Sequence, residues 1–576
     1  MAPHEGYENL LNLKKYLFGL RMKFSAFQKS ENWTTDDLKN ICSKLKNNKA
    51  RDREGLIYEM FKPSNCGNDV FASLTKLFNL IKTQLLVPDF FQTMTITSIY
   101  KSKGLKTLLK SERGIFNLNK VRNLMDKLLY NDIYDDVERS LSCSNVGGRR
   151  GRSIRDQLFI VYGVVNDVAN GKADSLSVTS YDVMMCFDKM NYAETNNDLY
   201  DAKVTGDKFA LISTLDNKCN AVIKTPVGET KQLTFYELIM QGSTFGSIKC
   251  TVQQDTLGQD LLSCEEGVGL YTYKGSVDIP PVCFLDDVLG LSKCGIETTE
   301  LNSLINSKIE SKNLKLGEDK CLELHIEKRG NKTVKCHSTT VKVHDSNIKK
   351  TKSIKYLGDV VNSEANINDT IHSRATKAIG MRSQFTSLIS SIALGNYYFD
   401  IGMIFRDSMY LNSMLVNSET WYYINQKNME TLLSADAKFF QILFKSHSKT
   451  SRDSYFIETG KLKINHIIAK RRLMFLFNIL KRDQSELLFK VYHIQTLRPC
   501  RNDWIHSIKY DKENYQIQLS DREISEMSKS QFKNYIEVKI NQKFYSELCD
   551  SSKSKVQSVK RTMKVDKNLK FKCNPI

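Results

Sequence analysis

Hydrophobic and polar residues alternate along three stretches of the chain, which is the period of a half-buried β-strand. The clearest stretch, residues 175–182, sets Leu176 and Val178 between serines and threonines. Residues 96–101 alternate more weakly before a lysine-rich turn, and residues 219–235 alternate on both sides of a Pro-Val-Gly turn. The three stretches predict strands, and the last of them predicts a hairpin.

Hydrophobic residues at helical spacing predict helices around these strands. One helix begins after Ser153, because Ser153 and Asp156 form the S-x-x-D signature of a capped N-terminus. The residues that then recur every three or four positions are Ile154, Leu158, Val161, Val165 and Val168. Residues 31–62 predict a capped helix, a basic turn and a second helix, with Thr34 or Thr35 as the N-cap.

The C-terminal part of the chain has a helical pattern. One helical face collects hydrophobic residues at Ile371, Ala375, Ala378, Phe385, Ile389 and Ile392. Residues 408–482 continue with hydrophobic positions at helical spacing and Lys or Arg outside them. The sequence therefore predicts a mostly helical region here.

Residues 280–291, PPVCFLDDVLGL, place two aspartates in a stretch that otherwise has the composition of a buried segment. One interpretation is that Asp286 and Asp287 form the two-residue turn of a hairpin, a position that favours Asp. The other interpretation starts from Phe284 and Leu285. Carboxylates packed against these residues repel each other and lose hydration, and a divalent cation neutralises both. A cation site of this kind requires a third carboxylate.

Asp182 is the best candidate for the third carboxylate, because it ends another predicted strand. A strand, helix, strand-turn-strand order is expected to bring Asp182 beside Asp286 in one antiparallel sheet, the split βαβ arrangement. Oxygen ligands on two adjacent strands suit Mg²⁺, with Mn²⁺ as an alternative. Two such ions about 4 Å apart promote in-line phosphoryl transfer, so the three aspartates imply this reaction class.

Two further features leave an interpretation open. Phe187 follows Asp182 by five residues and could lie beneath the sugar of a nucleotide, where it would exclude a 2′-hydroxyl. An ordinary core aromatic explains its spacing equally well. Arg149, Arg150 and Arg152 precede a predicted helix; a solvated cluster is the more common arrangement, and a direct phosphate contact is the alternative.

The length and net charge of the chain indicate a protein of several domains that binds a polyanion. The chain has 576 residues, too many for one core, and its 84 Lys and Arg against 65 Asp and Glu give a net charge of +19. Such a charge attracts a polyanion, for which nucleic acid is the common case. The 14 cysteines include no C-x-x-C pair, so neither a zinc ribbon nor a disulfide framework is indicated. Charges interrupt the hydrophobic stretches at the N-terminus, and no run approaches the roughly 18 apolar residues of a membrane helix, so we expect no membrane partner and a nuclear or cytoplasmic location.

Several motifs, taken in order, resemble those of a reverse transcriptase. Motifs A to E of that family are similar to YDVMMCFD, LIMQGSTFG, FLDD, KNLKLGEDKC and IKYLGDVV in this chain. Upstream, NNKARDREGLIYEMFK and TSIYKSKG…KSERGIF resemble the finger motifs of non-LTR, LINE-type retrotransposon polymerases. The resemblance continues through ETWYYINQKNMETLLSADAKFF and SYFIETGKLKINHIIAKRRLMFLFNIL, and it covers roughly residues 30 to 510.

The resemblance implies an α+β right-hand polymerase. Its parts would be fingers, a palm with an antiparallel split βαβ sheet, a helical thumb, and a mostly helical region after the thumb. The expected boundaries are an N-terminal helical extension at 1–50, fingers at 51–174, palm with motifs A to E at 175–362, thumb at 363–450 and a helical, basic C-terminal region at 451–576. Part of the fingers is expected to be interleaved with the palm.

The resemblance also implies site residues. Asp182, Asp286 and Asp287 would be the catalytic aspartates and would bind two Mg²⁺ ions. The nucleotide-binding residues would be Lys101, Arg113, Phe187, Gln241, Gly242 and Lys320. In this set the Arg113 guanidinium would grip the triphosphate, and Lys320 would give a proton to the departing pyrophosphate. The primer end would be held by Tyr356, Leu357 and Gly358.

The function that the resemblance implies is an RNA-directed DNA polymerase of a non-LTR retrotransposon. Its partners would be a template RNA, a DNA or RNA primer and dNTPs. About 30 residues precede the resemblance, too few for an endonuclease domain. An endonuclease in another domain, another protein or the host is therefore expected to act in trans. The alternative is a catalytically decayed, retrotransposon-derived basic RNA-binding protein, which would bind RNA with steep salt dependence and incorporate no nucleotide. A nuclease with the same two-metal chemistry is disfavoured, because Phe187 and Arg113 suit a nucleotide substrate.

Overall fold

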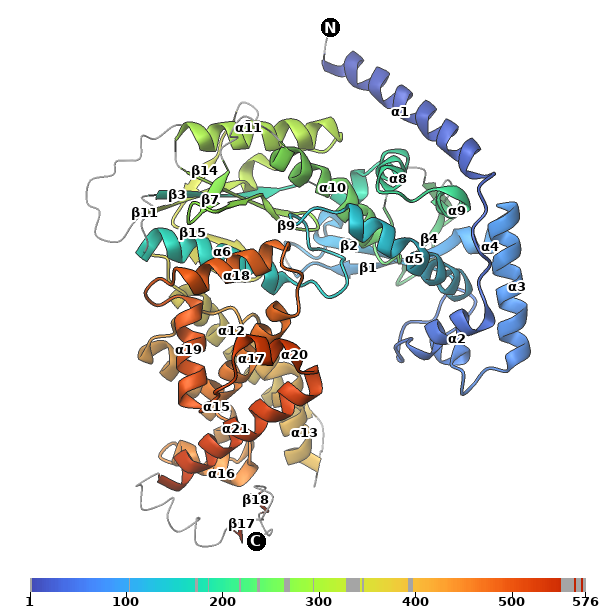
Figure 1. Cartoon of the computed structure of the whole chain (residues 1–576). Helices are drawn as coiled ribbons and strands as arrows, with labels where there is room; N and C mark the ends of the chain where they lie inside the picture. Colours follow the sequence, from blue (N-terminus) through green and yellow to red (C-terminus); the bar gives the residue numbers. More distant parts are fainter. Residues whose placement is uncertain are drawn as a thin grey trace.

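The computed structural model describes most of the chain. It covers residues 3–550, 564–565 and 571–572, with gaps at 103, 171–174, 185, 217–218, 236–238, 264–269, 294, 328–341, 344–345 and 392–396. Ile392, which the sequence assigns to a helical face, lies outside the described residues. Figure 1 shows an angular molecule with a mixed helix and sheet part across the top and a mainly helical part below one end of it.

A five-stranded sheet forms the centre of the molecule. Its strand order is β14 (Lys349–Thr351), β11 (Leu322–Glu327), β3 (Ser175–Asp182), β10 (Asp287–Ser292) and β9 (Val282–Phe284). β3 is antiparallel to both of its neighbours, so the antiparallel sheet predicted around residues 175–182 is confirmed. Successive residues of β3 point to opposite faces, and therefore Leu176 and Val178 enter one core while Tyr181 enters another.

Helices cover both faces of this central sheet. On one face lies α6 (Ile154–Asn170), and on the other α10 (Gly246–Ser263) and α11 (Ile296–Ser311). α6 begins where its capping signature predicts, since the Ser153 hydroxyl donates a hydrogen bond of 3.0 Å to the Asp156 carboxylate. The helical spacing is also confirmed, because the buried residues of α6 include Leu158, Val161, Val165 and Val168.

A second sheet lies toward the other end of the upper part of the molecule (Figure 1). It contains β2 (Glu112–Asn117), β1 (Thr93–Tyr100), β4 (Cys219–Thr225) and β5 (Gly228–Glu229), with β6 (Leu233–Phe235) paired to β4. β1 and β4 run parallel and the other pairs antiparallel. The strand predicted at residues 96–101 and the hairpin predicted within residues 219–235 are both confirmed.

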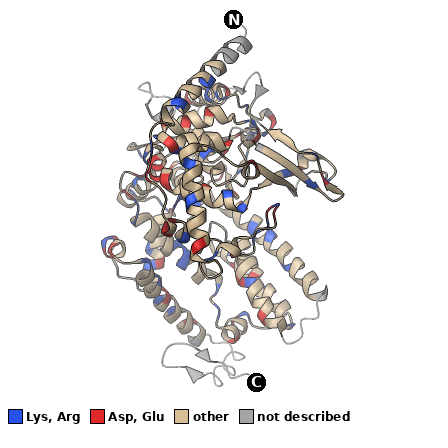
Figure 2. Ribbon diagram, turned by 90° about the vertical axis from the view of Figure 1, so that its right-hand side faces the viewer, with Lys and Arg blue, Asp and Glu red and all other residues tan. Residues whose placement is uncertain are grey.

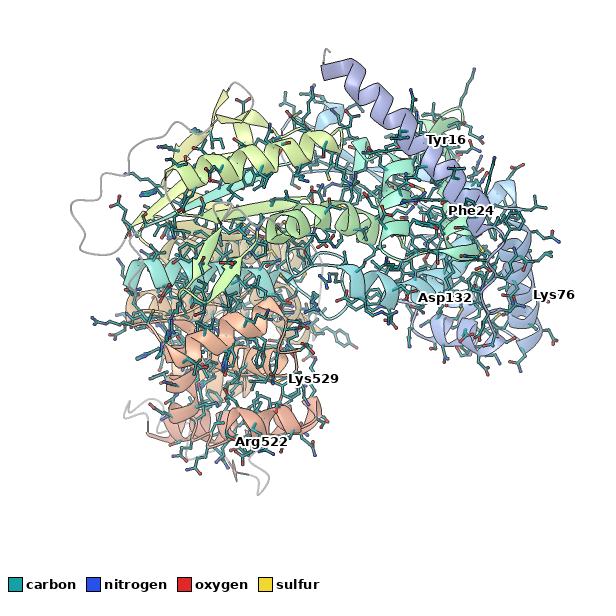
Figure 3. All side chains as sticks on the ribbon, turned by 45° about the horizontal axis from the view of Figure 1, so that its top comes forward. Tyr16, Phe24, Lys76, Asp132, Arg522 and Lys529 are labelled. Carbon is teal, nitrogen blue, oxygen red and sulfur yellow. The ribbon has the colours of Figure 1, made fainter. Side chains whose placement is uncertain are left out.

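Helices surround this second sheet. They are α1 (Pro3–Ser25), α2 (Thr35–Ser43), α3 (Asn68–Gln84), α4 (Asp89–Gln92), α5 (Lys120–Ser140), α8 (Tyr192–Asp201) and α9 (Gly206–Asp216). α1 lies along the edge of the molecule and carries Tyr16 and Phe24 on its surface (Figure 3). α2 begins with a full capping box between Thr34 and Asp37, which confirms Thr34 as its N-cap.

The second helix predicted within residues 31–62 is wrong. Only one 3-10 turn, η1 (Tyr58–Phe61), forms there. The cause is Asp52, whose carboxylate accepts hydrogen bonds from the backbone N–H groups of Leu56 at 2.8 Å and Lys120 at 2.7 Å. Gly55 adopts a φ of +85° in the same turn. The Asp52 side chain thus bonds backbone N–H groups in a turn, and this turn forms in place of a helix.

The lower part of the molecule is helical, as predicted for residues 408–482 (Figure 1). Its helices are α12 (Asn368–Ser391), α13 (Tyr398–Phe405), the π-helix η5 (Arg406–Tyr410), α14 (Leu411–Met414), α15 (Gln426–Leu443), α16 (Arg452–Thr459), α17 (Ile464–Leu480), α18 (Leu487–Leu497), α19 (Trp504–Asn514), α20 (Asp521–Glu526) and α21 (Lys529–Asp550). The remaining elements are η2 (Leu109–Ser111), α7 (Cys186–Lys189), β7 (Tyr271–Tyr273), β8 (Val277–Ile279), η3 (Glu318–Lys320), β12 (Lys342–Val343), β13 (Ser346–Asn347), β15 (Ser353–Tyr356), β16 (Asp359–Asn362), β17 (Lys564–Val565) and β18 (Phe571–Lys572).

One buried carboxylate, Asp359 at the start of β16, connects the helical part to α6, which packs on the central sheet. It accepts hydrogen bonds from Tyr162 of α6 at 3.0 Å, Arg374 of α12 at 2.6 Å, Asn417 at 3.2 Å and Trp421 at 3.1 Å. Arg374 neutralises the charge in this position, where Asp359 is fully buried. Four segments of the chain are therefore fixed to one another at a single side chain.

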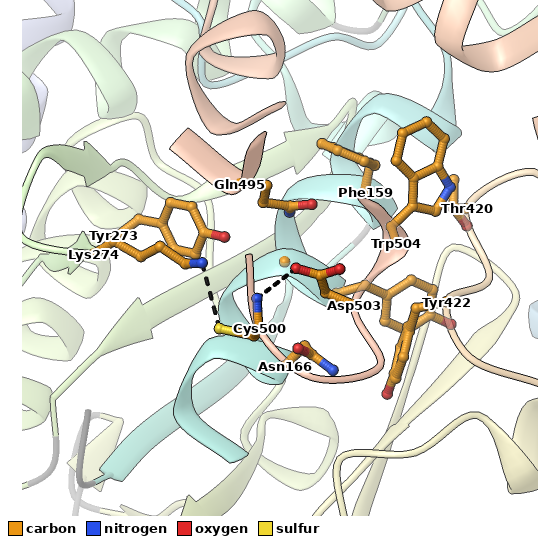
Figure 4. A pocket seen from close by; sticks show the side chains of 12 residues that line it. Phe159, Asn166, Tyr273, Lys274, Thr420, Tyr422, Gln495, Cys500, Asp503 and Trp504 are labelled. Carbon is orange, nitrogen blue, oxygen red and sulfur yellow. Dashed lines mark hydrogen bonds between the residues drawn. The ribbon is translucent and has the colours of Figure 1, made fainter. Parts of the chain in front are cut away.

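The helical part is also packed tightly against α6 (Figure 4). The cavity left at this contact is only about 10 Å³. Phe159 of α6 and Trp504 of α19 meet edge to face, with ring centroids 5.1 Å apart. On the other side of the cavity, Nζ of Lys274 lies 3.4 Å from Sγ of Cys500. This close packing holds the C-terminal helices in a fixed position on the sheet.

The three arginines before α6 do not form the solvated cluster that the sequence favours. Arg149 is buried, and its guanidinium donates to both oxygens of Glu138 at 3.0 and 2.8 Å. Arg152 also pairs with Glu138, at 3.2 Å. Only Arg150 is exposed, with its guanidinium 4.0 Å from the centre of the Tyr134 ring. Arg149 and Arg152 therefore stabilise the fold through ion pairs. Arg150 is the one of the three that is exposed enough to contact a ligand.

Within the described part of the chain, every helix is too short or too polar to pass through a lipid bilayer. Lys and Arg are spread over the upper and lower parts of the molecule (Figure 2).

Candidate active site

The predicted hairpin at FLDD is present, but its turn differs from the expected one. Asp287 pairs with Phe284, so the two turn residues are Leu285 and Asp286. The interpretation that Asp286 and Asp287 form the turn is therefore wrong by one residue. Asp287 is instead the first residue of β10, where it lies directly opposite Asp182 of β3. The pairing of the two strands thus brings Asp182 beside both members of the aspartate pair.

A strained turn fixes this position. Leu285 has a φ of +57°, which branched residues seldom adopt. Asn145 holds it, accepting from the Leu285 N–H at 3.2 Å and donating to its carbonyl at 3.3 Å. Gly147 is required beside the turn, because a Cβ there would lie 2.4 Å from the Leu285 nitrogen. The segment before α6 therefore supports the turn that carries Asp286.

The three carboxylates act on one another electrostatically. Desolvation first, and then repulsion by Asp286 and Asp182, raise the pKa of Asp287 to about 6. Desolvation and the Asp182 charge also raise the pKa of Asp286, while the Arg113 guanidinium opposes that rise. Asp287 is exposed at the end of its strand, so protons or cations from the solvent can reach this group of acids.

Lys320 approaches the group from η3. Its Nζ lies 2.8 Å from Oδ2 of Asp182. The turn before it is fixed by the Gly317 N–H, which donates to the Asp182 carbonyl at 2.8 Å. A side chain at Gly317 would crowd the same carboxylate, since its Cβ would lie 3.0 Å from Oδ2. The segment KNLKLGEDKC thus places a cation on the first of the three aspartates.

Arg113 and Lys101 lie at the end of the β1–β2 pair. Arg113 is exposed on β2, opposite Ile99 of β1, and its charge reaches Asp286. Lys101 follows β1 directly, is exposed, and is fixed through its backbone N–H, which donates to Ser111 at 2.8 Å. The second sheet therefore presents at least one cation toward the acidic turn of the central sheet.

Phe187 lies in α7, five residues after Asp182. It is half-buried and packs on the core that contains Tyr181, and its carbonyl accepts a hydrogen bond of 3.0 Å from the Ile239 N–H. Both interpretations of the sequence are compatible with this position: one side of the residue packs on the core while part of it remains open.

Gln241 and Gly242 form a loop against β2. The Gln241 carbonyl accepts from the Phe116 N–H at 2.9 Å. Gly242 has a φ of +108°, and a Cβ would lie 2.7 Å from the Phe116 carbonyl oxygen. Glycine is required for this approach, which joins the loop before α10 to the strand that carries Arg113.

Tyr356 is buried, and its hydroxyl donates to the Val282 carbonyl of β9 at 2.7 Å. Its side chain therefore connects the β15–β16 hairpin to the central sheet, and any primer contact at this position would involve its backbone. Leu357 and Gly358 form the turn of the hairpin, both with positive φ, and they are only half-buried. A primer contact by this turn stays a prediction.

The chemistry of the three aspartates suits a divalent cation, but the arrangement of their side chains does not yet form a binding site for one. Carboxylate oxygens are the ligands that Mg²⁺ prefers, and their mutual repulsion supplies the driving force. Among the described residues, however, no group of three or more His, Cys, Asp or Glu side chains is arranged closely enough to hold an ion. The Asp182 carboxylate is instead turned to Lys320. Binding an ion therefore requires the Asp182 side chain to exchange this partner.

Sequence reasoning missed a basic cavity beside the Gly242 loop. The cavity has a volume of about 660 Å³. The described residues that line it include no Asp or Glu, and its cations are Lys44, Lys46, Lys49, Lys120, Lys127 and Arg150. Tyr58 and Tyr130 add aromatic rings to the same wall. The run KLKNNK at residues 44–49 was the available signal, but its partners on α5 lie more than 70 residues away.

No protein-family model matches this chain. Among solved structures, the apo telomerase of Candida tropicalis is similar with a TM-score of 0.37 and 12% identity over 74% of each chain. A telomerase of Candida albicans, in complex with the TWJ fragment of telomeric RNA, has a TM-score of 0.36 and 12% identity. That match covers 66% of each chain, just under two thirds of the telomerase chain. Similarities this weak assign neither a family nor an activity to the chain.

Proposed function

We propose that the chain is an RNA-directed DNA polymerase that joins dNTPs to a primer 3′-hydroxyl. The observation that supports the proposal best is the cross-strand pair of Asp182 and Asp287, with Asp286 in the adjoining turn. Three carboxylates at one sheet edge, with raised pKa values at Asp286 and Asp287, are costly unless cations bind there. The order of the five sequence motifs resembles that of reverse transcriptases and agrees with this reaction class.

In this proposal the chain's own residues position the nucleotide. Two Mg²⁺ ions, or Mn²⁺, held by the three aspartates would activate the primer hydroxyl and steady the leaving group. Arg113 would bind the triphosphate, with Lys101 beside it, and Phe187 would lie beneath the sugar. Lys320, which holds Asp182 at 2.8 Å, would be released when Asp182 binds an ion. Its ammonium would then donate a proton to pyrophosphate.

The basic cavity supports a single-stranded template, which the resemblance of the motifs suggests is RNA. Cations and aromatic rings together bind single strands with little sequence preference, because they meet phosphates and bases respectively. The cavity includes Gly242, so a strand bound there would reach the loop that contacts β2. In this arrangement the second sheet and its helices would act as fingers, the central sheet as palm and α12 to α15 as thumb.

The motifs further suggest a polymerase of a non-LTR retrotransposon. Such an element needs a nicked target, and an endonuclease in another domain or protein would act in trans. Leu357 and Gly358 would hold the end of a DNA or RNA primer near β9, since Tyr356 ties their hairpin to that strand.

Primer extension tests the proposal. The purified chain, given an RNA template, a DNA primer, dNTPs and Mg²⁺, should extend the primer. Asp286→Asn should lower the rate by at least about 100-fold, because bound metals stabilise the transition state by several kcal/mol. Asp278→Asn, which removes another exposed strand aspartate, is the matched control and should leave the rate unchanged. Extension that survives Asp286→Asn would reject the assigned site.

A second candidate is a basic RNA-binding protein without turnover. The Lys320 bond to Asp182 favours it, because this ion pair already neutralises one of the three acids without a metal. This candidate predicts salt-dependent RNA binding by a chain that incorporates no nucleotide under any metal condition.

A further inference from the structure

A cavity of about 710 Å³ lies among the C-terminal helices. Its lining residues come from α15, α17, α19, α21 and the residues that flank α15, α17 and α19, and none of them belongs to the central sheet. The cavity is thus separate from the three aspartates. Its volume is typical of sites that take small molecules or single groups of a larger ligand.

The floor of this cavity is charged and incompletely paired. Asp511 is 3% exposed, and its Oδ2 lies 3.1 Å from Nε of Arg472. Among the described residues, neither of these two atoms has a hydrogen bond of good geometry. Oδ1 of Asn465, also on the cavity wall, has no partner there either. Buried polar atoms of this kind are costly, and a ligand that supplies donors and acceptors side by side removes the cost.

The rim of the cavity is aromatic. Tyr510 of α19 is 64% exposed and Tyr423, before α15, is 50% exposed, so both rings are open to a ligand. His506 lies one helical turn before Tyr510 on the same helix. Flat rings above a floor of hydrogen-bonding groups suit a flat, polar, aromatic ligand.

We propose that this cavity binds an unpaired guanine base. The Watson–Crick edge of guanine offers two neighbouring N–H donors, which match a carboxylate such as Asp511, and an acceptor oxygen beside them, which matches Arg472. Adenine and uracil each present only one donor group on that edge. Tyr510 and Tyr423 would stack on the face of the base.

The charges of the cavity favour a base within a strand over a free nucleotide. The acids in the described lining, Glu430, Asp511 and Glu547, outnumber its cations, Lys463 and Arg472. The cavity would therefore repel a free triphosphate, whereas the phosphates of a strand would stay outside. Arg501 and Lys509, exposed beside Asn502 and Tyr510 in the sequence, are available to such phosphates.

Photocrosslinking of the full chain tests the proposal. The probe is a short oligo(A) RNA that carries one 6-thioguanosine, and the crosslinked peptide is identified by mass spectrometry. We expect crosslinks within the peptide that contains Tyr510 or Tyr423. Tyr510→Ala should reduce their yield by about five- to 100-fold, through the loss of stacking. Tyr16→Ala is the matched control, since Tyr16 on α1 is 66% exposed and should not matter.

Binding measurements show which base is bound and whether it belongs to an RNA strand or to a free nucleotide. Replacement of guanosine by inosine, which lacks the 2-amino group, should weaken RNA binding at this site by about fivefold or more, and Asp511→Asn should abolish the difference. GMP that competes at a similar concentration would identify a nucleotide site, and competition by RNA alone would identify a strand site; both support the guanine assignment. Crosslinks that map elsewhere, or equal affinity for guanosine and inosine, would overturn it. Because primer extension is not used, failure of the polymerase proposal leaves this test intact.

Discussion

At the scale of single residues, Phe187 distinguishes two interpretations of the same position. It packs on the core beside Tyr181 and remains half-buried. If it excludes a 2′-hydroxyl, Phe187→Ala should raise incorporation of ribonucleotides relative to deoxyribonucleotides by at least about tenfold. Phe187→Tyr keeps the ring and should keep the discrimination. Competition between dNTP and rNTP in primer extension gives the ratio, and a variant that loses only stability would identify a core residue.

Asp126 provides a test of the electrostatics at the residue scale. The residue lies in α5, fully buried and 3.5 Å from Arg122, and burial raises its pKa to about 6 from an ordinary value of 3.8. The folded chain therefore keeps a proton that the unfolded chain has lost between about pH 4 and pH 6. Stability from this group is present below about pH 4 and is lost as the pH rises through 6.

Asp126→Asn removes this dependence on pH. The variant should gain up to about 3 kcal/mol relative to the parent chain between pH 4 and pH 7, the free energy that corresponds to the raised pKa. Urea unfolding at both pH values measures the difference. An equal difference at the two pH values would show that the Asp126 carboxyl is not destabilised by burial.

At the scale of elements, Asp359 connects the β15–β16 hairpin to α6 and α12 through hydrogen bonds. Asp359→Ala should cost about 3 to 5 kcal/mol, because it leaves the buried charge of Arg374 without a partner. Tyr162→Phe removes one hydrogen bond of the same carboxylate and should cost about 1 kcal/mol. Denaturant unfolding compares them, and an equal cost for the two variants would contradict the central role of this carboxylate.

The elements that the sequence predicted correctly are those whose signal is local. The alternation at residues 175–182, the cap at Ser153 and the turn at residues 226–228 each depend on neighbours in the chain, and all three are confirmed. The helix predicted near residue 52 failed because its competitor, the bond from Lys120 to Asp52, comes from a distant segment. The same reason hid the buried position of Arg149, whose partner Glu138 belongs to the preceding helix.

The site divides in the same way. The pairing of β3 with β10 followed from strand order, so the approach of Asp182 to the aspartate pair could be predicted, although its direct cross-strand partner is Asp287 and not the expected Asp286. The exact turn could not, because Leu285 adopts its strained φ only with support from Asn145 and Gly147. The burial of Tyr356 depends equally on a tertiary contact, its bond to Val282. The role of a residue that depends on contacts between distant segments cannot be predicted from the local sequence.

At the scale of the whole molecule, the basic cavity should dominate the electrostatic part of RNA binding. Lys46 and Lys49 are exposed in its wall. Replacing both by Gln should lower the slope of log affinity against log salt for single-stranded RNA by about 1.4, if each lysine neutralises one phosphate. Lys529→Gln with Lys533→Gln is the matched control, since both are exposed cations on α21, which contributes no described residue to the lining of the cavity. Equal slopes for the two double variants would place the RNA elsewhere.

In the proposed function, Asp182, Asp286 and Asp287 together bind the divalent cations for nucleotide addition. The most direct measurement is electron paramagnetic resonance of Mn²⁺ bound to the chain in the presence of RNA template, primer and an unreactive dNTP analogue. We predict about two bound ions per chain, of which Asp286→Asn loses at least one and Asp278→Asn loses none. A chain that binds no Mn²⁺, or an Asp286→Asn variant that binds it as the parent does, would show that these aspartates are not the metal site of a polymerase.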